Sequence, residues 1–139
     1  MMIKNVSGKR KRAVAKASIK DGNGKVIINK KPYELMEMFN RMRIEEPLRI
    51  AKETIGEIKF DIEVKVRGGG KEGQVEASRL AIARALVQAM KEQDAKKAEL
   101  LKKAYLSYDR NLLIADVRRK EMYKPGDSKA RAKRQKSYR

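Results

Sequence analysis

The 139-residue sequence contains no cysteine and no histidine. The lack of cysteine excludes disulfides, thiolate metal sites and cysteine nucleophiles. The lack of histidine removes the commonest metal ligand and the usual general base. The carboxylates are scattered and mostly stand next to lysine or arginine, as on a solvated surface, so they indicate no catalytic pair. We therefore expect no enzyme, no cofactor, no metal and no small-molecule substrate.

Long hydrophobic runs are also missing. The N-terminal stretch MMIKNVSGKRKR lacks the apolar core of a signal peptide, and no run approaches the roughly 18 apolar residues of a membrane span. We therefore expect a cytoplasmic protein with no membrane partner. The length is sufficient for one domain with a real core but not for two.

Positive charge is what the sequence has in excess, with 36 basic against 18 acidic residues and a net charge of +18. Self-repulsion of this size favours a polyanionic partner, so nucleic acid is the leading hypothesis. Residues 1–20 contain seven lysines or arginines and no acid, and residues 117–139 contain ten against two acids. We therefore predict a globular body over residues 1–116, with a basic N-terminal strand, and an extended basic tail over residues 117–139.

Alternating side chains predict strands in two parts of the body. Residues 9–20 are expected to form one strand, with alanines and Ile19 on its inner face and Arg10, Arg12 and Lys16 on a cationic outer face. DGNG at residues 21–24 predicts a hairpin turn into a second strand at 25–29. The clearest strand is 58–67, in which five apolar residues alternate with charged ones.

Helical patterns fill most of the remaining body. A short helix is expected at residues 30–39, with Leu35, Met36 and Phe39 on its buried side, and another at 45–56. Residues 74–91 have a wide apolar stripe typical of an amphipathic helix, and residues 95–106 predict a lysine-rich one. This order predicts an α+β protein, a two-layer α/β sandwich with helices on one face of a mainly antiparallel sheet.

The glycine-rich stretch GGGKEG, residues 68–73, raises the question of a phosphate-binding loop. It does not fit the Walker pattern, because Lys71 is followed by Glu72 and no hydroxyl is placed for magnesium. A tight turn between a strand and a helix is the simpler interpretation. The turn is also compatible with its amides, Arg67 and Lys71 resting on an RNA backbone. An ATP-binding enzyme stays as an alternative that a saturable nucleotide-binding isotherm would revive.

The basic ends have several interpretations. Soluble surfaces normally mix both signs of charge, so the acid-free N-terminal run predicts nucleic-acid contact. The composition of the tail predicts disorder when free, followed by ordering on phosphates, with Tyr138 able to stack on a base or ribose. A nuclear-import address and a membrane-surface peptide are alternatives for the tail. For the whole chain the alternative is a DNA-compacting architectural protein.

Three segments together resemble the family of ribosomal small-subunit protein S9. They are GKRKRAVAKASI at 8–19 with the DGNGKVIIN stretch that follows, VRGGGKEGQVEASRLAIARAL at 66–86, and ADVRRKEMYKPGDSKARAKRQKSYR at 115–139. The ending Ser-Tyr-Arg is closer to the archaeal and eukaryotic form than to the Ser-Lys-Arg of many bacterial members. Residues 106–114 are unlike the bacterial loop.

The resemblance implies a structural protein in the head of the small ribosomal subunit, located in the cytoplasm. It implies a fold like the second domain of ribosomal protein S5, with a left-handed βαβ crossover. Its implied partners are small-subunit ribosomal RNA, neighbouring head proteins and P-site tRNA. The predicted ribosomal-RNA contacts, from the residues and the resemblance together, are Lys9, Arg10, Lys11, Arg12, Lys16, Arg67, Lys71, Arg118, Arg119, Lys120, Lys124, Lys129, Arg131, Lys133 and Arg134. The implied tRNA contacts are Lys136, Ser137, Tyr138 and Arg139.

Overall fold

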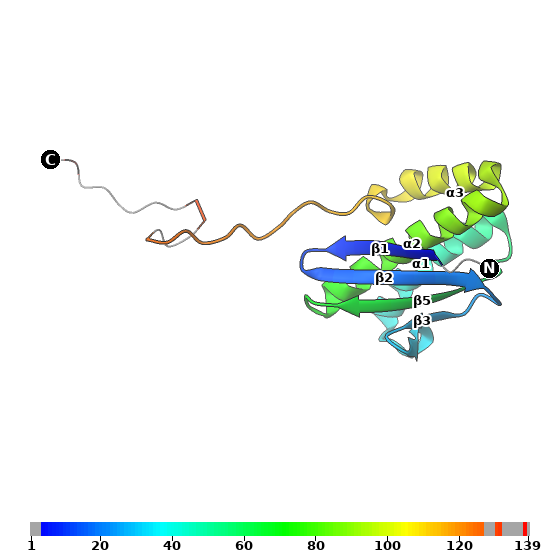
Figure 1. Cartoon of the computed structure of the whole chain (residues 1–139), viewed down its shortest axis with the longest axis horizontal. Helices are drawn as coiled ribbons and strands as arrows, with labels where there is room; N and C mark the ends of the chain where they lie inside the picture. The colour runs from blue at the N-terminus through cyan, green and yellow to red at the C-terminus, as the bar shows by residue number, and fades with distance from the viewer. Residues whose placement is uncertain (1–3, 127–129, 132–137, 139) are drawn as a thin grey trace.

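The computed structural model describes residues 4–126, 130, 131 and 138 of the chain (Figure 1). The strands are β1 Lys4–Arg10, β2 Ala13–Asp21, β3 Val26–Ile28, β4 Lys31–Pro32 and β5 Phe60–Arg67. The α-helices are α1 Met38–Ile55, α2 Lys71–Gln93 and α3 Ala95–Tyr108. Two short 3-10 helices, η1 Tyr33–Leu35 and η2 Arg110–Leu112, precede α1 and follow α3.

The strands form one sheet in the order β1-β2-β5-β3-β4, and the helices cover one of its faces (Figure 1). All neighbouring strands are antiparallel except β3 and β5, which are parallel and joined through α1. The core lies between this face and the helices, and it contains the alternate residues of β2 and β5. The mixed α+β class is confirmed, including the placement of the helices on one face.

The prediction of a single strand over residues 9–20 is wrong. A two-residue turn at Lys11 and Arg12 divides this region, and Arg10 pairs with Ala13 across it. Lys11 adopts a left-handed φ of 52°, which is uncommon outside glycine and gives no signal in a run of basic residues. As a result β1 is a separate edge strand, and Arg10 lies on the helix-covered face of the sheet instead of the open one.

The predicted hairpin between β2 and β3 is also wrong, because β5 lies between these two strands. The turn at residues 21–25 instead crosses the end of β5. There the Asp61 carboxylate accepts hydrogen bonds from the backbone N–H groups of Asn23 and Lys25, at 2.9 and 3.0 Å. The Lys25 N–H contributes most to holding the pKa of Asp61 below its usual value. A local turn signal could not reveal this pairing with a distant strand.

The predicted helix at 45–56 is confirmed as part of the longer α1, which ends before Gly56 as expected. The predicted helix at 30–39 is wrong, because β4 and η1 occupy residues 31–35 and α1 begins only at Met38. Pro47 lies inside α1 and is buried, and its carbonyl accepts a 2.8 Å hydrogen bond from the Tyr105 hydroxyl. Burial raises the pKa of that hydroxyl well above its usual value. Leu35 and Phe39, expected on a buried side, are exposed, whereas Met36 packs against the core.

The two C-terminal helices match their predictions closely. α2 begins at Lys71, slightly earlier than expected, and packs an alanine-rich face on β1 and β2. α3 is capped by Asp94, whose carboxylate accepts from the backbone N–H groups of Lys96 and Lys97. Since α2 contacts β1, β2 and β5, it fixes the positions of the strands that carry the predicted RNA contacts Lys9, Arg10, Lys16 and Arg67.

The contact between β1 and α2 depends on Gly8. A Cβ atom added there would lie 2.5 Å from the Ala77 carbonyl oxygen and 2.7 Å from the Ala81 nitrogen. We expect Gly8→Ala to lower the free energy of unfolding by about 1–3 kcal/mol, because backbone must move to admit the methyl group. Denaturant unfolding measures this change.

Gly73→Ala is the matched control. The added Cβ would meet Ala13 Cβ at an ordinary 3.6 Å, and alanine is the better helix former, so stability should stay equal or rise. Equal stability of Gly8→Ala and the wild-type protein would contradict the close packing of β1 on α2.

Candidate nucleic-acid interface

The open face of the sheet is positively charged at the end nearest the turn between β1 and β2. The strand register places Lys9, Val14 and Arg67 side by side in one row. The next row contains Ser7, Lys16 and Lys65. All four cationic side chains of these rows are exposed, and within the described part of the chain only Lys65 has a carboxylate neighbour, Glu63 at 3.6 Å. Further along, Lys20 lies opposite Asp61, so the charge there is balanced.

The glycine turn lies against this same end. Gly68 has a φ of 77°, and a Cβ atom on it would lie 2.6 Å from the Arg12 carbonyl oxygen. The Gln74 side-chain amide donates a 3.2 Å hydrogen bond to the Gly68 carbonyl oxygen and closes the turn. The glycines therefore serve close packing between β5, α2 and the β1–β2 turn, which confirms the prediction of a tight turn.

The folding of the sheet thus brings two distant sequence motifs together. Lys11 and Arg12 are exposed in the β1–β2 turn, and Lys71 is exposed at the start of α2, which has no side-chain cap at Gly70. Free backbone N–H groups at a helix start attract anions, so they add to the positive potential of these side chains. We call Lys9, Lys11, Arg12, Lys16, Lys65, Arg67 and Lys71 the cationic sheet surface. Lys65 is the member that the sequence prediction missed, although its alternation with Arg67 on the same strand indicated it.

Arg10, a predicted RNA contact, lies in a different environment. On the helix side of the sheet its Nε is 2.7 Å from Glu76 Oε2, and its guanidinium also pairs with Asp116. Asp116 accepts two further bonds from the Arg118 side chain to Oδ2, at 2.9 and 2.7 Å. These bonds from Arg118, followed by those from its backbone N–H and from Arg10, hold the pKa of Asp116 well below its usual value.

A second set of contacts fixes the chain just before Asp116. Arg84 on α2 donates 2.8 Å and 2.9 Å hydrogen bonds to the carbonyl oxygens of Leu113 and Ser7. Arg79 pairs with Asp109 at 3.1 Å and with Glu46. The contacts of Arg10, Arg84 and Asp116 therefore attach the start of the tail to β1 and α2, and we call these three residues the tail anchor. Residue patterns alone gave Arg84 and Asp116 no role.

Beyond the anchor, residues 117–126 are exposed and contain neither helix nor strand. Figure 1 shows this part of the chain leading away from the body. Arg119 donates to the carbonyl oxygens of Asp116 and Arg118, and the Lys120 ammonium lies 5.1 Å from the centre of the Tyr123 ring. Arg131 pairs with Glu121 at 3.1 Å, while Lys124 and Tyr138 are exposed. The predicted contacts at Lys129, Lys133, Arg134, Lys136, Ser137 and Arg139 lie outside the described residues.

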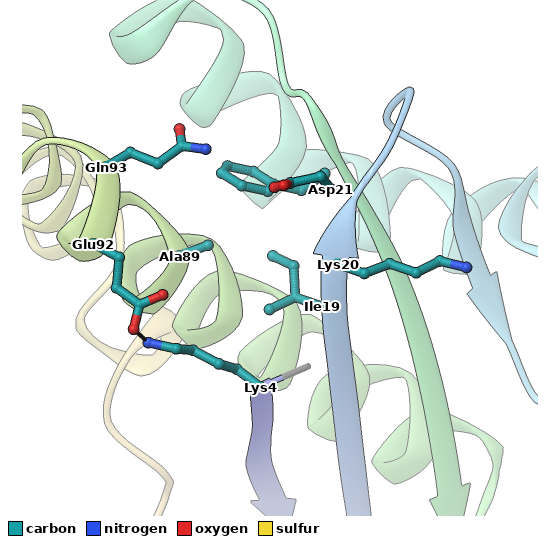
Figure 2. Close-up of a pocket in the computed structure, with 8 residues that line it drawn as sticks. Lys4, Ile19, Lys20, Asp21, Ala89, Glu92 and Gln93 are labelled. Atoms are coloured by element: carbon teal, nitrogen blue, oxygen red, sulfur yellow. Dashed lines mark ion pairs between the residues drawn. The ribbon is translucent and has the colours of Figure 1, made fainter. Parts of the chain in front are cut away.

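The opposite end of the sheet contains a small pocket of about 200 Å³ (Figure 2). Ile19 and Asp21 of β2 face Ala89 and Gln93 of α2 across it, and an ion pair between Lys4 and Glu92 spans one side. Nothing in this pocket resembles a catalytic constellation. Within residues 4–126, 130, 131 and 138 there is no cluster of three or more potential metal ligands, and no helix is long and apolar enough to cross a membrane.

These features define a basic α+β protein. Its exposed cationic surfaces suit a polyanionic partner, while its carboxylates mainly form ion pairs and hydrogen bonds within the fold. The chain belongs to the ribosomal protein S9/S16 family, whose model matches residues 8–139. It is 46% identical to the small ribosomal subunit protein uS9 of Methanococcus maripaludis strain S2, over the full length of both chains. It is 43% identical to the uS9 protein of Methanococcus vannielii, also over both full lengths. The family resemblance stated from the sequence, including its archaeal character, is confirmed.

The tail anchor makes a direct prediction. Asp116→Asn removes the charge that holds Arg10 and Arg118, so amide hydrogen exchange in residues 115–119 should accelerate several-fold while the melting temperature changes little.

The low pKa of Asp116 also sets a pH dependence for the tail anchor. Its stabilising contribution is fully present above the ordinary carboxyl pKa of about 4 and is lost as the pH falls through the lower folded-state pKa.

The matched control for Asp116→Asn is Glu121→Gln, which removes the pairing with Arg131 beyond the anchor. That variant should leave exchange in residues 115–119 unchanged. If both variants exchange like the wild-type protein, Asp116 does not anchor the tail.

Proposed function

We propose that the chain binds small-subunit ribosomal RNA through the cationic sheet surface and the basic tail, and that the end of the tail reaches P-site tRNA. Its family makes it a structural protein of the small ribosomal subunit and not an enzyme. The observation that carries the RNA-binding proposal is the convergence of two basic sequence motifs on one end of the open sheet face.

The cationic sheet surface suits a phosphate backbone better than base edges. Lysine presents a compact point charge, and arginine presents a planar fork that can bridge two phosphate oxygens. The glycine turn has no side chains to keep a backbone at a distance. Contacts of this kind supply affinity and position, while the shape of a folded RNA supplies specificity.

The tail has a different part in this proposal. The tail anchor fixes where the chain leaves the body, so the basic residues after Val117 start from a defined point next to β1. Lys129, Arg131, Lys133 and Arg134 would then line a path through ribosomal RNA, and residues 136–139 would approach the tRNA. The resemblance to the S9 family supports this path, a location in the head of the subunit, and a left-handed crossover for the β3–α1–β5 connection.

The role of the sheet surface is testable by neutralising three of its cations together, Lys16→Gln, Lys65→Gln and Arg67→Gln. The salt dependence of binding to purified small-subunit ribosomal RNA should become shallower, by roughly 0.7–0.9 log units per log unit of salt for each phosphate that the variant no longer neutralises. Filter binding at several salt concentrations measures this slope, and an equal concentration of duplex DNA as competitor distinguishes the DNA-compacting alternative.

The matched control removes the same charge from α3, by Lys97→Gln, Lys102→Gln and Lys103→Gln. These lysines are exposed on the layer facing away from the sheet. If both triple variants reduce the slope equally, binding follows net charge alone and the sheet surface has no special role.

Deleting residues 129–139 tests the tail. The segment has no aliphatic residue larger than alanine, so the melting temperature should be unchanged, while RNA affinity and its salt dependence should both fall. Small subunits assembled with the truncated protein should also bind P-site tRNA more weakly. A sharp loss of thermal stability would instead assign the tail to the fold and contradict its proposed role.

A further inference from the structure

Four large apolar side chains are exposed where η1 leads into α1. Leu35, Met38, Phe39 and Met42 are 76%, 61%, 74% and 51% exposed. We call them the η1–α1 apolar patch. Single exposed apolar residues are normal on protein surfaces, but neighbouring ones of this size usually mark a surface that a partner covers.

The patch lies on the side of α1 that faces away from the core. The helix buries Asn40, Ile44 and Pro47 against the rest of the body. At about 100° per residue, Met38, Phe39 and Met42 project from the opposite side of the helix. Further along that outer side the exposed residues are charged, as usual for a surface helix. The first turns of α1 therefore place large apolar side chains on the outer side, which the packing of this domain does not explain.

The described part of the tail does not cover this patch. η1 follows β4 at one edge of the sheet and contacts β3, whereas Arg84 binds Leu113 beside β1 at the other edge. From there the described chain leads away from the body (Figure 1). The patch and the tail are thus separate parts of the molecule, while Glu37 beside the patch lies 3.9 Å from Lys71 of the cationic sheet surface.

The charge around the patch distinguishes between possible partners. Residues 33–46 contain four glutamates and two arginines, in a chain with a net charge of +18. Both arginines already pair with carboxylates, Arg41 with Glu45 at 3.1 Å and Arg43 with Glu72. Glu34 and Glu37 adjoin the patch and are exposed. The patch itself contains no cation for RNA phosphates, whereas an apolar protein segment with basic flanks would match its apolar side chains and the exposed carboxylates of Glu34 and Glu37.

We propose that the η1–α1 apolar patch docks a neighbouring protein of the small subunit, through an apolar segment flanked by lysine or arginine. This rests on the proposed function, because the neighbour is present only in the assembled particle. Phe39 supplies a rigid aromatic anchor within the patch. The methionines around it are flexible and can adapt to the shape of the partner.

Photo-crosslinking in assembled particles tests the proposal directly. Phe39 is replaced by benzoylphenylalanine in the full-length protein, and small subunits that contain it are isolated and irradiated. The expected result is a crosslink to one other protein of the subunit, which mass spectrometry assigns to an apolar segment with basic flanks. A crosslink to ribosomal RNA, a crosslink to a second copy of this chain, or the absence of any crosslink overturns the proposal.

A pair of variants separates docking from RNA binding. Phe39→Ser with Met42→Ser removes two of the four apolar side chains of the patch, and Leu100→Ser with Leu106→Ser removes exposed apolar residues of α3. Both should melt like the wild-type protein and bind protein-free ribosomal RNA within about twofold of its affinity. In competition with wild-type protein, only the patch variant should be retained several-fold less in small subunits.

Each other outcome of the variant test has a definite meaning. Equal retention of the two variants overturns the docking proposal, as does a loss of RNA affinity or of thermal stability confined to the patch variant. If the wild-type protein itself fails to bind ribosomal RNA, the proposed RNA-binding function fails, while a crosslink from position 39 to a protein would still support the docking site.

Discussion

Repulsion among like charges is the constraint on which this structure depends. A chain with a net charge of +18 folds stably only if its cations are either neutralised within the body or placed where a polyanion can reach them. Three arginines on the helix side follow the first solution, since Arg10, Arg43 and Arg79 each pair with two carboxylates. The open sheet face follows the second, since its cations near the β1–β2 turn mostly lack acidic neighbours among the residues that the structure describes.

The arginines of this chain therefore have two different roles. Some pair with acceptors within the body, and others are exposed on the open sheet face. Arg79 and Arg84 lie in the segment at residues 66–86 that resembles the S9 family, yet their guanidinium groups bind Asp109 and the carbonyl oxygens of Leu113 and Ser7. They thereby hold the start of the tail against the body. A basic residue in a strongly basic protein can therefore act within the fold, through contacts that orient the proposed RNA-binding surfaces.

Sequence patterns were most informative where the structure is local. The alternation along β5, the apolar stripe of α2 and the tight glycine turn were all predicted, because each depends on neighbours in the chain. The position of β5 between β2 and β3 was missed, since the DGNG turn is also compatible with a simple hairpin. Arg10 was assigned to the wrong face because Lys11 turns the chain without glycine or proline. The tail anchor joins residues from both ends of the chain, and no local pattern indicates such a contact.

The proposed division between the open sheet face and the helix side can be tested by comparing lysine reactivity in the free protein and in its complex with purified small-subunit ribosomal RNA. Acetylation under mild conditions, followed by mass spectrometry, reports the accessibility of each lysine. Lys9, Lys16, Lys65 and Lys71 should lose reactivity in the complex, while Lys97, Lys102 and Lys103 on α3 should keep theirs. Protection of the α3 lysines with an unprotected sheet surface would show that the cationic sheet surface does not bind the RNA.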